Sequence, residues 1–252
     1  MPYLIDTHAH LDMVDDYDIA VENALKNGVK KIILPAVEEK DFHKIISISE
    51  KYDNVYFQLG VHPSEAKTWN DTVENVIREL SSHEKLVAIG EIGLDYYWDK
   101  TFVDIQKDVL IRQILLANEL NLPIVIHDRE AHKDCMEIVK EYNKNSEVIF
   151  HCFSGSVEMM RECVKNAWYI ALGGVVTFKN AVKMKDVAKE IPLEYLLLET
   201  DSPYLAPVPY RGKNNEPAFV KYVAEEIANL RGISFEEIAD ITTQNAERVF
   251  KI

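Results

Sequence analysis

The sequence predicts a (β/α)8 TIM barrel, an α/β fold, with a short C-terminal helical extension. Short apolar runs rich in Val, Ile and Leu alternate with amphipathic segments along the whole chain, with a period of roughly 30 residues. Such runs are typical of parallel strands that are covered on both faces. Eight of them in 252 residues favour a closed barrel over an open doubly wound sheet. No Gly-rich phosphate-binding motif follows any run, and no linker interrupts the chain, so we expect one domain over residues 1–252.

The individual elements follow from this alternation. Segment 18–27 is expected to be a helix that ends before Gly28, and 72–80 a helix capped by Asp71 or Thr72. Segment 102–121 is the longest expected helix, and 217–231 ends at Gly232. The C-terminal extension is expected as a short terminal pair that begins at a capping box, in which Ser234 precedes Glu237 by three residues. The expected strands are 3–7, 31–37, 55–61, 86–92, 123–126, 148–150, 169–173 and 195–198.

Composition limits the function and the location. A hydrophobic content of 47% fits a soluble globular protein, and no apolar run approaches the roughly 20 residues that span a bilayer. No export signal is evident and the cysteines number three, so we expect a cytoplasmic protein with reduced thiols and no membrane or stable protein partner. The net charge of −14 argues against a broad basic face for nucleic acid. It leaves room for a nuclease that grips a few phosphates through metal ions.

Polar side chains follow almost every expected strand at its carboxyl end. Residues two apart on a strand share a face, so His8 and His10 of DTHAH are expected to project together. A buried core histidine or a solvated loop acid would explain any one such residue. However, five of the eight histidines lie at strand ends, and neither explanation accounts well for the whole set. The carboxyl ends of the strands are also where the active-site residues of a barrel lie. The residues are His8, His10, His62, Glu91, Asp95, His127, Arg129, His151, Glu199 and Asp201.

These residue types predict a metal site. Imidazoles with carboxylates and no thiolate suit zinc, manganese, iron or nickel, and tolerate magnesium less well. One catalytic ion needs only about three protein ligands, so four histidines and two carboxylates suggest two divalent ions that share a carboxylate. Glu91, in the middle of the chain order, is the expected bridge.

Several motifs together resemble the TatD-type deoxyribonucleases, which are metal-dependent hydrolases with an amidohydrolase-like barrel. The motifs are DTHAHLD, GVHP, GEIGLDYY, IHDRE, HCFSG, ETDSPYLAPVPYRGKNNEP and NAERVF. The resemblance implies that Asp201 also orients or deprotonates the attacking water. It implies one ion on His8, His10, Glu91 and Asp201, and a second on Glu91, His127 and His151.

The resemblance further implies hydrolysis of DNA phosphodiester bonds, with a 3′–5′ exodeoxyribonuclease as the expected activity and oligonucleotide ends as substrates. Arg129 and Arg211 are expected to contact phosphate, and Asp95 to lie on the substrate side. His62 and Glu199 are expected to support the ligands, contact substrate or form a weak extra metal site. Two other readings remain open. One is a metal hydrolase of a small amide, lactone or phosphoester, which suits the acidic charge, and the other is a scaffold with a dead site, which the intact ligand set disfavours.

Overall fold

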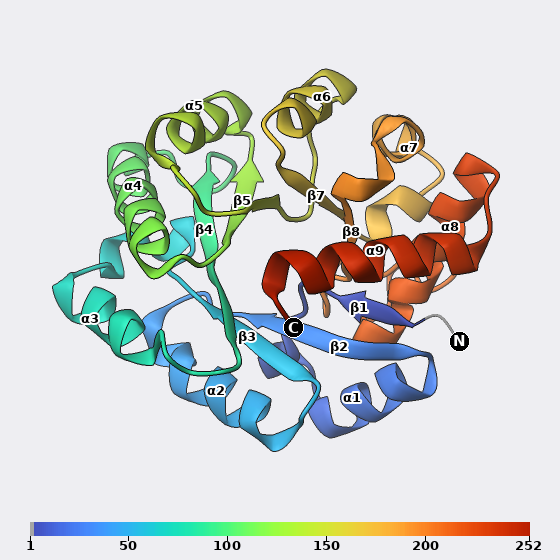
Figure 1. Cartoon of the computed structure of the whole chain (residues 1–252), viewed down its shortest axis with the longest axis horizontal. Coiled ribbons are helices and arrows are strands. Elements are labelled where there is room, and N and C mark those ends of the chain that lie inside the picture. The colour runs from blue at the N-terminus through green and yellow to red at the C-terminus, as the bar shows by residue number, and fades with distance from the viewer. Residues whose placement is uncertain (1–2) are drawn as a thin grey trace. The chain divides into compact units, whose positions relative to one another are not determined.

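The computed structural model describes residues 3–252, in which eight parallel strands occur in the order β1 to β8 and alternate with helices (Figure 1). All eight expected strands are confirmed, with bounds that differ by up to three residues at an end. The chain divides into two compact units, which we describe separately. The first unit contains residues 3–34 and 151–252, and the second contains residues 35–150. The expectation of one domain stays a prediction.

The first unit contains four of the strands. Strand β7 pairs in parallel with β8, and β1 pairs in parallel with β2. The Thr7 N–H donates to the Leu198 carbonyl at 3.1 Å, which joins the ends of β1 and β8. Helix α9 packs on both of these strands (Figure 1). The elements are β1 (Leu4–Asp6), α1 (Tyr17–Lys26), β2 (Val29–Pro35, whose last residue belongs to the second unit), α6 (Val157–Lys165), β7 (Tyr169–Leu172), α7 (Val182–Glu190), β8 (Leu196–Leu198), α8 (Val220–Arg231) and α9 (Phe235–Phe250).

The second unit contains the other four strands, which pair in parallel in chain order. Every residue of β4 is buried, as expected of a strand covered on both faces. Helix α4 packs on this strand (Figure 1). The elements are α2 (Phe42–Lys51), β3 (Val55–Leu59), the 3-10 helix η3 (Pro63–Thr68), α3 (Asp71–Leu80), β4 (Leu86–Asp95), α4 (Val103–Leu120), β5 (Ile124–Arg129), α5 (His132–Tyr142) and β6 (Val148–Phe150).

Three details differ from the sequence expectations. Asn70, not Asp71 or Thr72, caps α3, because its side chain accepts from two backbone N–H groups at 2.8 and 3.2 Å. The segment expected as one helix over 217–231 begins as a 3-10 turn and becomes α-helical at Val220. The C-terminal extension is one helix of 16 residues that begins after the Ser234 cap.

Two expectations from composition can be compared with the structure. Within residues 3–252, no helix combines the length and the apolar composition that a membrane span requires. The three cysteines are free thiols, as expected.

Gly93 allows β4 and β5 to pair beside the functional residues. It lies opposite His127 in the parallel register, with a φ of +151°. A Cβ atom at this position would lie 1.9 Å from the carbonyl oxygen of His127. Because the obstacle is backbone and the strand is fully buried, neither side can move away cheaply.

We therefore predict that Gly93→Ala lowers the free energy of unfolding by about 3 kcal/mol or more. Gly28→Ala is the matched control, because Gly28 also has a positive φ, +83°, but has open space around its Cβ position. The control should lose only about 1 kcal/mol. Urea denaturation of both variants measures the difference, and equal losses would contradict the close packing of β4 on β5.

Candidate metal centre

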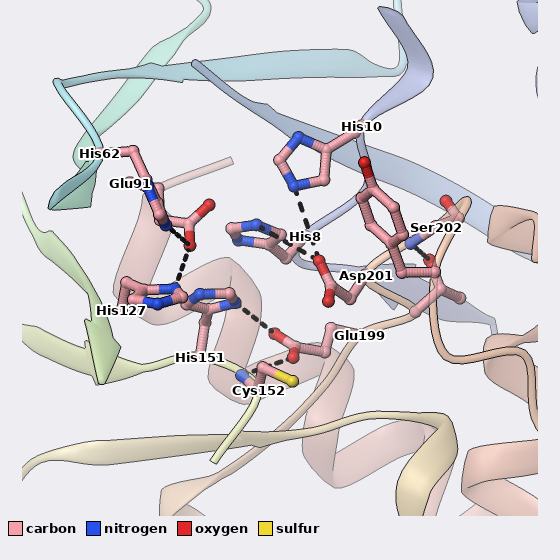
Figure 2. A network of polar contacts seen from close by, with 12 residues as sticks. His8, His10, His62, Glu91, His127, His151, Cys152, Glu199, Asp201 and Ser202 are labelled. Carbon is pink, nitrogen blue, oxygen red and sulfur yellow. Dashed lines mark hydrogen bonds and ion pairs between the residues drawn. The ribbon is translucent and has the colours of Figure 1, made fainter. Parts of the chain in front are cut away.

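Four buried side chains and one half-buried side chain of the first unit form a group, the first cluster (Figure 2). Nitrogen atoms of His8 and His10 and an oxygen of Asp201 all lie within 4.8 Å of one another. The Nε2 atom of His10 is 3.5 Å from Oδ1 of Asp201, and that of His8 is 4.0 Å from the same oxygen. The backbone at Asp201 is in the left-handed region, with a φ of +55°. The members are His8, His10, His151, Glu199 and Asp201.

The remaining two members pack against His8. The rings of His8 and His151 stack with centroids 3.9 Å apart and an interplanar angle of 11°. The Nδ1 atom of His151 lies 3.8 Å from Oε2 of Glu199 (Figure 2). The other oxygen of Glu199 accepts the Cys152 N–H at 2.6 Å, and the residue has no exposed surface. Glu199 is thus fixed toward the histidines, where its carboxylate can serve as a ligand or orient one.

Asp6 holds this cluster from behind. Its carboxylate accepts the backbone N–H and the hydroxyl of Thr200 at 2.9 and 2.6 Å, and the N–H of His8 at 3.3 Å. These bonds fix the residues that carry His8 and Asp201. Burial raises the pKa of Asp6 to about 7, although hydrogen bonds from Thr200 and His8 lower it. The strand pattern places Asp6 on one face with His8 and His10, whereas no pattern in the sequence points to Thr200, a hydroxyl between two acids.

Asp201 is ionised at neutral pH. Burial raises the pKa of its carboxyl, but the hydrogen bond with His10 and the charges of the neighbouring histidines outweigh burial. The pKa therefore lies below its usual value. An ionised carboxylate that faces two imidazoles can serve as a metal ligand or as a proton acceptor.

The second unit carries a separate group, the second cluster, made of His62, Glu91 and His127. The Nδ1 atom of His127 is 2.7 Å from Oε1 of Glu91 (Figure 2). The Nε2 atom of His127 is 3.1 Å from Oδ2 of Asp95. A carboxylate behind a ligating histidine is a common arrangement, because it fixes the tautomer and the ring orientation. With Nε2–H bonded to Asp95, neutral His127 directs the lone pair of Nδ1 toward Glu91. That pair is the side of the cluster that could hold a metal ion.

His62 is oriented differently. The Ser64 N–H donates to Nδ1 of His62 at 3.1 Å, so Nδ1 must keep its lone pair. A neutral His62 then carries its proton on Nε2, which lies 3.6 Å from Oε1 of Glu91. The geometry favours His62 as a hydrogen-bond donor toward the Glu91 carboxylate rather than as a ligand through Nε2.

The remaining predicted residues surround the clusters in their own units. Asp95 is buried, and its carboxylate also accepts the N–H groups of Tyr97 and Trp98. The Arg129 guanidinium lies 3.9 Å from the Tyr97 ring centroid. Arg211, in the first unit, lies 4.2 Å above the ring of Phe178. Both arginines are exposed.

The donor atoms of the first cluster fit a divalent ion. Zn–N and Zn–O bonds of about 2.0–2.1 Å place two tetrahedral ligand atoms about 3.4 Å apart. The His10–Asp201 separation, 3.5 Å, is close to that value. In the second cluster, the His127–Glu91 distance of 2.7 Å is that of a hydrogen bond, in which a proton lies between the two atoms. An ion bound there would move the two atoms apart. The sharing of Glu91 by two ions stays a prediction.

Comparisons with known proteins agree with this chemistry. The family described as "TatD related DNase" matches residues 5–251. The chain is 49% identical to the uncharacterized metal-dependent hydrolase YabD of Bacillus subtilis, with 99% of each chain covered. It is 38% identical to the uncharacterized metal-dependent hydrolase YcfH of Escherichia coli K12, over 99% of this chain and 96% of the relative.

A solved structure shows the same fold. The TatD homolog YjjV of Escherichia coli K12 matches with a TM-score of 0.93 and 31% identity, over 99% of this chain and 98% of that one. Together with the order of the strands, this match confirms the predicted TIM-barrel class.

The His127 contacts predict a pH dependence in protein freed of metal. Burial lowers the pKa of His127, but hydrogen bonds and charges of Asp95 and Glu91 outweigh it and raise the pKa to about 9. A folded-state pKa above the unfolded value, about 6.5, contributes stability that is complete below pH 6.5 and is lost as the pH rises through 9. The slope is at most about 1.4 kcal/mol per pH unit.

Urea denaturation of chelator-treated wild type and His127→Gln between pH 6 and 10 measures this contribution. The stability advantage of the wild type over the variant should shrink steadily between about pH 6.5 and 9. A constant difference over that range would contradict the paired imidazolium.

Proposed function

The chain belongs to the TatD related DNase family of metal-dependent hydrolases, and we propose that it hydrolyses DNA phosphodiester bonds from the 3′ end of an oligonucleotide with two divalent ions per chain. The observation that carries the proposal is the group of two buried histidines, His8 and His10, beside the half-buried Asp201 in a chain of this family. We assign His8, His10 and Asp201, and Glu91, His127 and His151, as metal ligands. Zinc and manganese suit these ligands better than magnesium.

The ions would supply Lewis acidity, which lowers the pKa of water and neutralises charge on a phosphate. Hydrolysis breaks one P–O bond, and water supplies the hydroxyl on phosphorus and the proton on the leaving oxygen. Asp201 is the proposed acceptor of the water proton, because its carboxylate is ionised and hydrogen-bonded to His10. Asp95 holds the ring of His127, and Asp6 holds the backbone beside His8 and Asp201.

Local cations can contact the substrate phosphates although the chain carries a net charge of −14. Arg129 and Arg211 are exposed, and each rests on an aromatic ring that holds the guanidinium without neutralising it. We assign both to phosphate contact. With so few cations, the enzyme would grip a short segment rather than a long duplex. The acidic charge favours a small amide, lactone or phosphoester as the second candidate substrate. The proposal also includes a cytoplasmic location and no stable protein partner.

The test removes metal and then varies the substrate. Chelator should abolish activity, and added Zn²⁺ or Mn²⁺ should restore it while circular dichroism shows an unchanged fold. Oligonucleotides labelled at the 5′ or the 3′ end, tested beside p-nitrophenyl phosphate and a lactone, identify the substrate class. Faster turnover of the small substrates would overturn the DNA assignment, and a chelated protein that unfolds would make the ions structural.

Asp201→Asn tests the proton acceptor with a nearly unchanged volume. We predict that kcat falls by at least about 100-fold, because the amide cannot accept the proton of water. Asp186→Asn, on the exposed surface of α7, is the matched control and should keep wild-type activity. A variant Asp201→Asn with near-normal kcat, measured with full metal content, would contradict the role.

A further inference from the structure

A cavity of about 210 Å³ lies in the second unit, next to the second cluster. One wall comes from η3 and the other from the segment between β4 and α4. The lining includes Ser64, Lys67, Asp95, Trp98, Asp99 and Phe102. Its volume is below the roughly 300 Å³ at which pockets for drug-sized ligands begin, so it has room for one small ring system.

Two lining residues touch the histidines on either side of Glu91. The hydroxyl of Ser64 lies 2.8 Å from Nδ1 of His62, and the carboxylate of Asp95 lies 3.1 Å from Nε2 of His127. The opposite nitrogens of these histidines lie 3.6 and 2.7 Å from Glu91. Only one side-chain layer, His62 or His127, therefore separates the cavity from the Glu91 carboxylate. One nucleotide is long enough to extend from the cavity to that carboxylate.

The segment that carries Trp98 is held in place. Asp95 accepts the backbone N–H groups of Tyr97 and Trp98 at 2.8 and 3.3 Å. Asp95 is also attached to α4, because the Gln106 side chain accepts the Asp95 N–H and donates to the Asp95 carbonyl. Although this backbone is anchored, the Trp98 side chain is 72% exposed. An indole held in water at the rim of a cavity is a surface on which a flat ring can stack.

Cations lie beside the aromatic groups. The Lys67 ammonium lies 4.1 Å from the ring centroid of Phe102, and the Arg129 guanidinium lies 5.4 Å from that of Trp98. Both cations are exposed. The Asp99 carboxylate accepts the Thr101 N–H at 2.8 Å, and the charge of Lys67 contributes to the lowering of its pKa. Aromatic rings interleaved with cations are the combination that binds unpaired nucleotides.

We propose that this cavity is a subsite for one unpaired nucleobase of the substrate, which stacks on Trp98 while Lys67 contacts the adjacent phosphate. The proposal deepens the proposed function and rests on it for the choice of an oligonucleotide as ligand. It assigns Trp98 and Lys67 as binding residues, and it places base recognition on the segment between β4 and α4.

The test compares two ligands that differ only in the base, 2′-deoxyadenosine 5′-monophosphate and 2-deoxyribose 5-phosphate. Calorimetric titration of the metal-loaded protein measures both dissociation constants. Stacking on an aromatic side chain should make the nucleotide bind about 5- to 150-fold more tightly than the sugar phosphate. Trp98→Ala should remove that difference, and Lys67→Met should weaken both ligands alike. Tyr142→Ala, which removes an aromatic residue at the end of α5 outside the cavity lining, is the matched control and should keep the difference.

The outcomes separate this proposal from the proposed function. Equal binding of both ligands by the wild type, or an unchanged preference in Trp98→Ala, would overturn the subsite whatever the enzyme cleaves. A preference that depends on Trp98, in a protein that cleaves no oligonucleotide, would support the subsite and overturn the nuclease assignment.

Discussion

The hydrogen bonds of the Asp6 carboxylate are the constraint on which the first cluster depends. They join the end of β1 to the residues after β8 through the N–H and hydroxyl of Thr200, and so hold His8 and Asp201 within 4.0 Å. In the second unit, the Asp95–His127–Glu91 chain has the same role. In both, a buried carboxylate that is not itself an assigned ligand orients the residues that are. A metal site needs this support, because free side chains would lose rotamer entropy on binding the ion.

The sequence indicated which polar residues cluster better than it indicated the residues that support them. Because side chains two residues apart on a strand share a face, the local sequence predicts that His8 and His10 point the same way. It also predicts which polar residues lie at strand ends. The burial of Glu199 depends on the Cys152 N–H, 47 residues away along the chain, and nothing local indicates that contact. The cap of α3 shows the same limit on a small scale. Asn70, Asp71 and Thr72 are all competent caps, and only the direction of the incoming chain selects Asn70.

A protein with a net negative charge can still bind nucleic acid if its positive side chains lie where the phosphates bind. Arg129, Lys67 and Arg211 each lie over an aromatic ring, so their charge stays available to a phosphate. The contacts of Asp95 connect this surface to the ligands, since one carboxylate orients His127 and anchors the backbone of Trp98. A substitution of Asp95 would therefore affect both the proposed metal binding and the proposed base recognition.

The metal content of three folded proteins tests the account most directly. The wild type should bind two divalent ions per chain, measured by elemental analysis after equilibrium dialysis. Glu91→Gln should lose more metal than His127→Asn, because the proposal assigns Glu91 to both ions and His127 to one. If Glu91→Gln folds and keeps two ions, or if the wild type binds none, the proposal of a hydrolase with two divalent ions is wrong.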